Sequence, residues 1–382
     1  MQMKRLTNGL DFLTNARLKI KATSEEIEVS VFGKGFGECI IINCGQNEYV
    51  VIDSFINPVT KNPIAIDYLN SMNEPITSIK KMVVTHWHSD HIRGVSTILE
   101  KAGENIKIVL NPIIKHEEFN RFLQYGINEK QESTSEFNNI LSIIKQRGPS
   151  CVVIAGCDKR IFSDEISTPV ELFSLSPQDS EVVEYINALN TEQQDTSIEY
   201  LDNNLLSVVI LMKYFDQGIL LGGDMENSSN KNNGWNAIVN NYSHTSVHPS
   251  LFKVPHHGSS TGHNKDVWEK ILADMPISVL STYNKSTKLP KDTDVKRLVS
   301  LSKKVYVVGN KIKRDRVLEQ KLRKNKSNIS IELIPQDIGL VRYRRNITSM
   351  NRECLIETFG DVQEYQADKD GVDYESSNLC AI

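Results

Sequence analysis

The chain has 382 residues, a formal net charge of −4, 39% hydrophobic residues and 24% charged residues, which are values typical of a globular protein. The small net charge gives no overall case for nucleic-acid binding, so any such surface would be a local patch. Six scattered cysteines without a C-x-x-C pair argue against a disulfide framework and a structural zinc site. No signal segment and no run of about 18 apolar residues occurs, so we expect a cytoplasmic protein with no membrane partner.

Apolar segments of strand length recur along the chain, and longer segments with helical spacing lie between them. The expected strands are residues 27–32, 39–43, 49–52, 81–85, 106–110, 151–155, 170–175, 206–214, 218–221, 251–254, 279–282, 305–308, 329–335 and 339–343. The expected helices are residues 64–72, 92–101, 117–146, 180–190 and 314–324. We expect a hairpin from residues 206–221, a polar loop at 191–204 and pairing of 329–335 with 339–343. This mixture predicts an α/β protein.

Three imidazoles and a carboxylate crowd the loop that follows the expected strand 81–85, in the run His86-Trp87-His88-Ser89-Asp90-His91. Neutral imidazole nitrogens and carboxylate oxygens are the usual ligands of borderline divalent metals. Alternate residues of an extended segment point the same way, so His86, His88 and Asp90 can converge. His91 follows as the chain turns into a helix. The run therefore predicts a metal site at the end of a strand, where a rigid sheet can aim a loop.

Three further motifs complete a pattern in chain order. A glycine-rich run, residues 33–37, leads to a strand that ends in Asp53. Gly222-Gly223-Asp224 follows the expected hairpin, and Pro255-His256-His257-Gly258-Ser259 follows a later strand. With the loop at residues 86–91, this pattern resembles the metallo-β-lactamase superfamily over roughly residues 27–345. The two later motifs, with Asn204-Leu205-Leu206-Ser207, look most like the hydrolase domain of the ComEC/Rec2 DNA-uptake proteins and their free-standing bacterial relatives.

The resemblance implies a fold and a domain organisation. It implies a four-layer αββα sandwich with the site at one edge of two sheets. The hydrolase domain would span residues 1–345, with an insertion at about 112–204 between the signature and the bridging aspartate. Residues 346–382 would form an acidic C-terminal tail, weakly ordered from Glu357 onward, because acidic residues dominate it.

The resemblance also assigns roles by position. The implied metal ligands are His86 and His88 for the first metal, Asp90 and His91 for the second, Asp224 as the bridge, and His257, with His256 as the alternative, as the terminal histidine. Asp90, Asp224 and His256 would carry catalysis, His256 by donating a hydrogen bond to the substrate or leaving group. Asp53 would hydrogen-bond near the ligands and so fix the tautomer and orientation of a histidine.

Two departures from the family pattern bear on the site. Superfamily members often place another histidine before the bridging aspartate, and His116, the only candidate, lies too close behind the signature. The first metal site would then be open or weak, or be completed by water, Asn204 or Ser207. Arg93 stands where the usual signature continues with glycine, and it could bind a phosphate oxygen or lie on a helix surface. Lys253 could contact substrate or be a solvated strand-edge lysine.

The expected chemistry is hydrolysis by a metal-bridged hydroxide held between two divalent ions, zinc or manganese. The resemblance favours a phosphodiesterase or nuclease acting on nucleic acid or a nucleotide. An acyl hydrolase for thioesters or lactones is the alternative on the same scaffold. A structural or signalling subunit with a degenerate site is the third reading. The T-H-W-H-x-D-H-I-R-G run is also similar to that of effectors in bacterial defence systems.

Two charged segments suggest partners. Residues 303–326 carry ten Lys or Arg against two acidic residues, and such a helix could follow a nucleic-acid backbone or be a solvated amphipathic helix. Residues 357–375 carry seven acidic residues against one lysine. We expect this tail either to dock a protein partner or to have no function.

Overall fold

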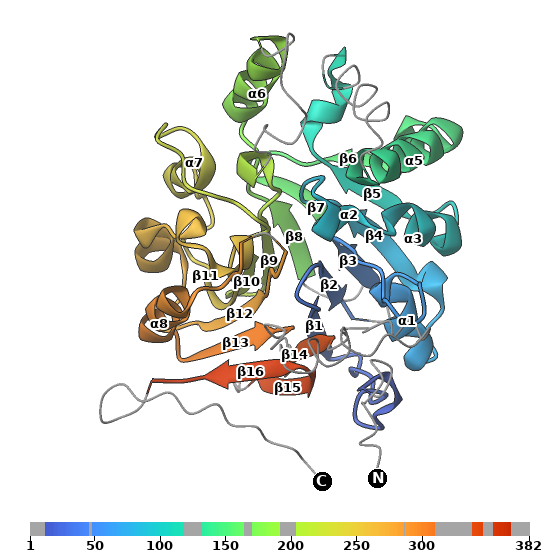
Figure 1. The fold of residues 1–382 in the computed structure, drawn as a ribbon, viewed down its shortest axis with the longest axis vertical. Helices are drawn as coiled ribbons and strands as arrows, with labels where there is room; N and C mark the ends of the chain where they lie inside the picture. The colour runs from blue at the N-terminus through green and yellow to red at the C-terminus, as the bar shows by residue number, and fades with distance from the viewer. Residues whose placement is uncertain are drawn as a thin grey trace, which may run out of the picture.

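Two sheets stacked face to face, with helices on both outer sides, make up the fold (Figure 1). The structure is a computed structural model. It describes residues 12–45, 48–117, 119, 132–163, 170–191, 204–285, 287–309, 338–346 and 354–367. The arrangement confirms the predicted four-layer αββα sandwich.

The first sheet has eight strands in the order β15-β14-β1-β2-β3-β4-β5-β6. Their bounds are Leu355–Gly360 for β15, Gly339–Asn346 for β14, Glu26–Gly33 for β1, Glu38–Asn43 for β2, Tyr49–Ile52 for β3, Ile79–Val83 for β4, Lys107–Leu110 for β5 and Val152–Ile154 for β6. The pairs from β15 to β3 are antiparallel, and those from β3 to β6 are parallel.

The second sheet also has eight strands, in the order β16-β13-β12-β11-β10-β9-β8-β7. Their bounds are Val362–Tyr365 for β16, Lys304–Val308 for β13, Ile277–Ser281 for β12, His248–Lys253 for β11, Gln217–Leu221 for β10, Ile210–Tyr214 for β9, Val170–Ser174 for β8 and Lys159–Ser163 for β7. β10 to β13 are parallel, and β9 and β10 form the predicted hairpin.

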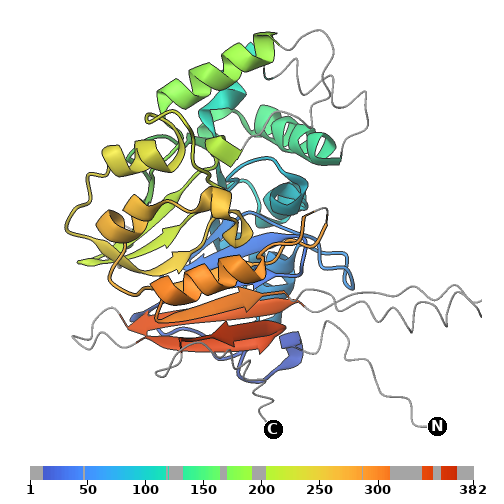
Figure 2. The same cartoon turned by 60° about the vertical axis from the view of Figure 1, so that its left-hand side comes forward.

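The helices of the described residues flank the sheets. Their bounds are Ile64–Ser71 for α1, Ser89–Ile92 for α2, Val95–Ala102 for α3, Glu132–Arg147 for α5, Asp179–Thr191 for α6, Gly234–Asn240 for α7 and Asp292–Leu301 for α8. α1, α3 and α5 lie against the first sheet, and α7 and α8 against the second (Figures 1 and 2). None of the helices in the described ranges is long and apolar enough to cross a membrane.

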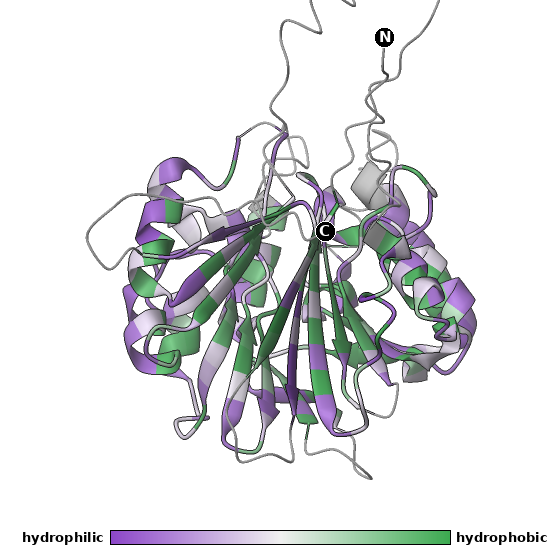
Figure 3. Cartoon of the chain, turned by 90° about the horizontal axis from the view of Figure 1, so that it is seen from below, coloured by the Kyte–Doolittle hydropathy of each residue, from purple (hydrophilic) through white to green (hydrophobic). Residues whose placement is uncertain are grey.

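Green, apolar residues run through the strands of both sheets in Figure 3, because both faces of the inner strands are covered. Other strands, such as β14 and β7, also carry charged residues. β2 shows the principle, since all six of its residues are buried. Cys39 and Ile41 pack under the helices, whereas Ile40 and Ile42 pack in the core between the sheets. Side chains alternate in direction along a strand, so one strand supplies two cores.

The carboxyl ends of parallel strands from both sheets meet at one edge of the sandwich. β3 ends next to Asp53 and β4 delivers the loop that begins at Thr85 in the first sheet. In the second sheet β10 leads to Asp224, and β11 leads to the turn His256–Gly258. Four loops from distant parts of the chain therefore converge on one place.

The predicted helix 92–101 is wrong at its start. The chain forms the short helix α2, breaks at Arg93 and Gly94, and begins α3 at Val95. Gly94 has a φ of +86°, and a Cβ there would lie 2.6 Å from Cδ1 of Ile56 and 2.9 Å from Cγ of Pro63. Because of this break, α2, which carries Asp90 and His91, can point in a different direction from the packed helix α3.

Gly94→Ala is therefore expected to destabilise the fold by about 2–5 kcal/mol, from left-handed backbone strain together with overpacking. The measurement is urea unfolding. Gly156→Ala is the control, because an added Cβ there meets nothing within 4 Å, and a change under about 0.5 kcal/mol is expected. Equal effects in the two variants would contradict the assignment of close packing at Gly94.

The C-terminal segment differs from the expectation of a weakly ordered tail from Glu357. β15 and β16 are outer strands of the two sheets, and Glu357 is buried with an ion pair to Arg342 at 2.6 Å. The acidic composition of this segment suggested a tail, because the sequence does not show that Glu357 pairs with a basic residue of the neighbouring strand β14.

The sequence analysis also missed β7 and α7. The predicted pairing of 329–335 with 339–343 is wrong, because β14 pairs with β1 on one side and with β15 on the other. The predicted helix 314–324 and strand 329–335, most of the basic segment 303–326, and residues 368–382 lie outside the described residues.

Candidate metal centre

The signature loop is held to the end of β3 by the carboxylate of Asp53. Its Oδ1 accepts a hydrogen bond from the backbone N–H of Thr85 at 2.8 Å, and its Oδ2 accepts one from Thr85 Oγ1 at 2.6 Å. Asp53 has a φ of +56°, which is rare for a residue other than glycine. The strained turn aims the carboxylate into the loop, as the resemblance implied for this strand-end acid.

The same carboxylate sets the tautomers of two histidines. Nδ1 of His91 lies 2.7 Å from Asp53 Oδ2, an acceptor, so Nδ1 carries the proton. Thr85 Oγ1 gives its proton to Asp53 and lies 3.0 Å from Nδ1 of His86, so His86 also donates from Nδ1. Both histidines are therefore held with Nε2 as the nitrogen that can bind a metal.

His257 is oriented in the same way from the second sheet. Its Nδ1 lies 3.2 Å from the carbonyl oxygen of Ser281, at the end of β12, and a carbonyl can only accept. Nε2 of His257 then lies 3.3 Å from Oδ2 of Asp90 and 3.5 Å from Oδ2 of Asp224. His257 has a φ of +50° and His256 one of +46°, so the backbone of this turn is strained at the site.

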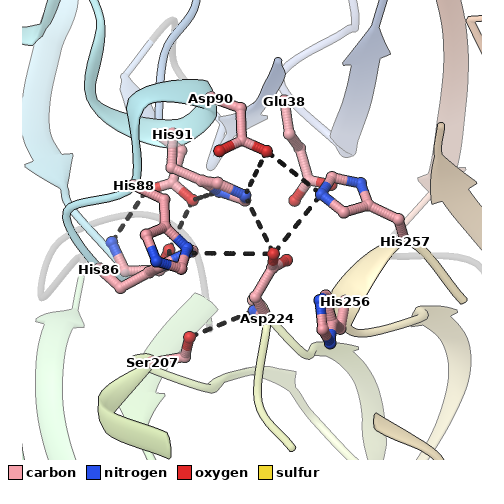
Figure 4. A network of polar contacts seen from close by, with 12 residues as sticks. Glu38, His86, His88, Asp90, His91, Ser207, Asp224, His256 and His257 are labelled. Atoms are coloured by element: carbon pink, nitrogen blue, oxygen red, sulfur yellow. Dashed lines mark hydrogen bonds and ion pairs between the residues drawn. The ribbon is translucent and has the colours of Figure 1, made fainter. Parts of the chain in front are cut away.

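Asp224 lies at the centre of the cluster (Figure 4). Its Oδ2 is 3.4 Å from Nε2 of His91 and 4.0 Å from Nε2 of His86. Nε2 of His86 is in turn 3.0 Å from Nδ1 of His88. The structure thus brings together all six predicted metal ligands, with Asp224 in contact with both halves of the cluster.

The donor set fits divalent metals. Nε2 of His91 and of His257 and Oδ1 of Asp224 are buried and have no hydrogen-bond partner among the described residues. Buried polar atoms are rarely left so, and lone pairs that converge without donors between them are what a cation requires. Asp90, His91 and His257 form one compact group that could hold a metal ion. With Asp224 they could supply the second metal position.

The charges of the cluster point the same way. Burial lowers the pKa of His91, but Asp224, Asp90 and Asp53 outweigh burial and hold that pKa well above its usual range. Although burial opposes ionisation, His91 holds the pKa of Asp224 well below that of an ordinary carboxyl. The carboxylates of the cluster therefore stabilise a positive charge at His91. A bound metal cation could supply that positive charge in place of the proton on His91.

The first metal position has fewer ligands. His86 and His88 with Asp224 could form it, and His116 belongs to neither of the two His/Asp groups found in the described part of the chain. Ser207 lies beside this position, where its Oγ accepts a hydrogen bond from the backbone N–H of Asp224 at 3.3 Å. Asn204 is buried in the turn Asn204–Leu206 that precedes it.

The remaining predicted residues lie beside the cluster. His256 is half-buried, with Nδ1 3.0 Å from Oγ1 of Thr261 and in contact with Glu226. The reading of Lys253 as a solvated lysine is wrong, because it is fully buried and paired with Glu38. Sequence reasoning assigned no role to Glu38, Glu226 or Ser281. Among these supporting residues, only Lys253 could have been noticed from the sequence, because it places a charge within the otherwise apolar expected strand 251–254.

The fold and the cluster define a metal-dependent hydrolase of the αββα type. The sequence profile of the Metallo-beta-lactamase superfamily matches residues 32–263, more than half of the chain, so the chain belongs to this superfamily. No curated protein sequence matches the chain significantly.

Two solved structures illustrate the structural likeness. A motif mutant of a metallo-β-lactamase from Cronobacter sakazakii is 10% identical, with 59% of this chain and 75% of that chain covered and a TM-score of 0.32. The short form of human tRNase Z is 12% identical, with 59% and 76% covered and a TM-score of 0.30. At these identities and TM-scores the likenesses carry no argument about activity.

Proposed function

We propose that the chain is a metal-dependent phosphodiesterase or nuclease of the ComEC/Rec2-like branch. The observation that supports this substrate class is a rim of cations and aromatic rings beside the candidate metal centre. A phosphodiester brings a fixed negative charge, and nucleotides bring flat bases, so cations and rings suit them better than they suit neutral acyl substrates.

The rim is reached from the candidate ligand His257 through ring contacts. The ring of His257 lies 5.3 Å from that of Tyr283, and Tyr283 lies 5.6 Å from the ring of Phe36. The guanidinium carbon of Arg93 is 5.3 Å from the centre of the Phe36 ring, and Nζ of Lys285 is 4.8 Å from it. Two cations therefore gather on a single ring close to the metal cluster.

The two loops of the rim hold each other in place. The backbone N–H of Asn284 donates to the carbonyl oxygen of Gly35 at 2.5 Å. Gly35 has a φ of +81°, and a Cβ there would lie 2.6 Å from Nδ2 of Asn284. The glycine-rich run thus serves the close approach of the loop at residues 283–285, and through it the placement of Tyr283 and Lys285.

In the proposed reaction, bound divalent metals would supply Lewis acids and a water of lowered pKa. Asp224 would hold both metal positions together through its central carboxylate. Arg93 and Lys285 would bind non-bridging phosphate oxygens and so orient the phosphorus. His256, which is held at Nδ1 by Thr261, would offer its other nitrogen to the substrate or the leaving oxygen.

The test is cleavage of bis-nitrophenyl phosphate by the full chain with added manganese or zinc. Arg93→Ala and Lys285→Ala are each expected to raise KM about tenfold or more, through loss of charged hydrogen bonds to phosphate. Lys288→Ala is the control, because this lysine is exposed on the same loop. Turnover of a thioester or lactone panel without phosphodiester cleavage would contradict the proposal and establish the acyl-hydrolase alternative.

We further propose nucleic acid or a nucleotide as the natural substrate, and a role as an effector beside partner proteins in bacterial defence. These proposals draw on the resemblance of the signature run and on the charge of residues 303–326. A steep loss of nucleic-acid binding with added salt, in the full chain, is the expected sign of phosphate contacts. Binding that does not change with salt would contradict a backbone-tracking segment.

A further inference from the structure

Lys253 and Glu38 form an ion pair buried directly behind the candidate metal ligands. Nζ of Lys253 lies 2.6 Å from Oε1 of Glu38, and the two side chains are 0% and 1% exposed. Burying two charges is costly, and apolar residues of similar volume often stabilise a fold at least as well. Lys253 follows the buried apolar residues Leu251 and Phe252 in β11, so the fold alone does not explain a charge there.

On its lysine side the pair contacts the loop of the bridging carboxylate. Nζ of Lys253 donates a hydrogen bond to the carbonyl oxygen of Gly223 at 3.0 Å. The same Nζ lies 3.9 Å from Oδ1 of Asp224. Lys253 therefore fixes the backbone just before Asp224 and places a positive charge beside one oxygen of its carboxylate, while the other oxygen faces the histidines.

On its glutamate side the pair contacts the terminal histidine. Glu38 Oε2 accepts a hydrogen bond from Oγ of Ser281 at 2.5 Å. That Oγ lies 3.0 Å from Nδ1 of His257. Since Ser281 gives its only proton to the carboxylate, its oxygen can only accept from Nδ1–H of His257. Glu38 thereby reinforces the tautomer that turns Nε2 of His257 toward the cluster (Figure 4).

We infer that Lys253 and Glu38 are positioning residues that hold Asp224 and His257 in metal-binding geometry before an ion arrives. The inference rests on the metal centre of the proposed function and is independent of the substrate. Glu38 comes from β2 of the first sheet and Lys253 from β11 of the second, so the pair also joins the two sheets at the edge that carries the site.

The test is titration of the metal-free full chain with Co²⁺, followed by its visible absorption. Lys253→Met alone leaves a buried carboxylate unpaired, so the informative variant is the double substitution Lys253→Met with Glu38→Gln, which removes both charges. This variant is expected to fold, to bind Co²⁺ about 10–100-fold more weakly in its tighter step, and to show a changed absorption band. Ser281→Ala is expected to show a smaller loss in the same direction.

The matched control is Arg342→Met with Glu357→Gln. This pair is also buried, at 0% and 6% exposure and 2.6 Å, but its hydrogen bonds go to residues 17 and 18 and not to the candidate ligands. Its Co²⁺ affinity and spectrum are expected to equal those of the wild type. Wild-type affinity and spectrum in the Lys253/Glu38 variant, or equal losses in both double variants, would overturn the inference. A wild type that binds Co²⁺ but cleaves no phosphodiester would overturn only the proposed function.

Discussion

Asp224→Ala is expected to lower the affinity for divalent metal by about 100-fold or more and to remove phosphodiester cleavage while the chain still folds. Loss of residues that only support metal ligands already costs about 10–100-fold, and Asp224 contacts both halves of the cluster. The metal-free variant also loses the attraction between Asp224 and His91, so a moderate loss of stability is expected without loss of the fold. Calorimetric metal titration and the phosphodiesterase assay measure the two effects.

Asp216→Ala is the control for this change. Asp216 lies in the turn between the same two strands, β9 and β10, and is exposed. Metal affinity and turnover of this variant are expected to match the wild type. Retained cleavage in Asp224→Ala, with metal affinity unchanged, would defeat the assignment of Asp224 as the bridging ligand.

Asp53→Asn is expected to weaken metal binding by about 10–100-fold although Asp53 is not itself a proposed ligand. An amide has the same shape as the carboxylate, but its NH₂ group cannot accept from Nδ1 of His91. If that NH₂ faces His91, Nδ1 must become the acceptor and Nε2 must carry the proton, which blocks the metal-binding nitrogen. His86, which is fixed through Thr85, would lose its tautomer preference as well.

Asp67→Asn provides a matched control, since Asp67 is also a buried carboxylate that accepts hydrogen bonds, from Asn57, Thr60 and Asn62. Both variants are expected to lose stability, but only Asp53→Asn is expected to lose metal affinity. The measurements are thermal unfolding of the metal-free chains and metal titration. Equal metal affinities in the two variants would contradict the tautomer argument.

The cluster at residues 86–91 could be predicted from the sequence because its chemistry is concentrated, whereas the family resemblance implied Asp224 and His257. His86 to His91 lie on one loop, and Asp224 and His257 each follow a strand with glycines beside them. Of the two adjacent histidines the structure brings His257, and not His256, into the His/Asp cluster. No spacing rule separates two neighbouring residues in a strained turn, so that choice had to come from coordinates.

The supporting residues could not be predicted because their partners are remote in sequence. Glu38 and Lys253 are 215 positions apart (253 − 38), and nothing local reveals that β2 and β11 meet at one edge. The same reason hid β15, whose acidic Glu357 reads as a tail until Arg342 of β14 pairs with it. The break at Gly94 was missed because the residues that leave no room for a side chain there, Ile56 and Pro63, are brought close only by the tertiary fold.

Metal analysis of the purified full chain, combined with anomalous diffraction at the metal edge, tests the central claim most directly. We predict about two equivalents of divalent metal, one between His91, His257, Asp90 and Asp224, and a weaker one beside His86 and His88. Fewer than about one equivalent per chain, or a metal peak away from Nε2 of His91 and His257, would contradict the account and favour a structural or signalling subunit.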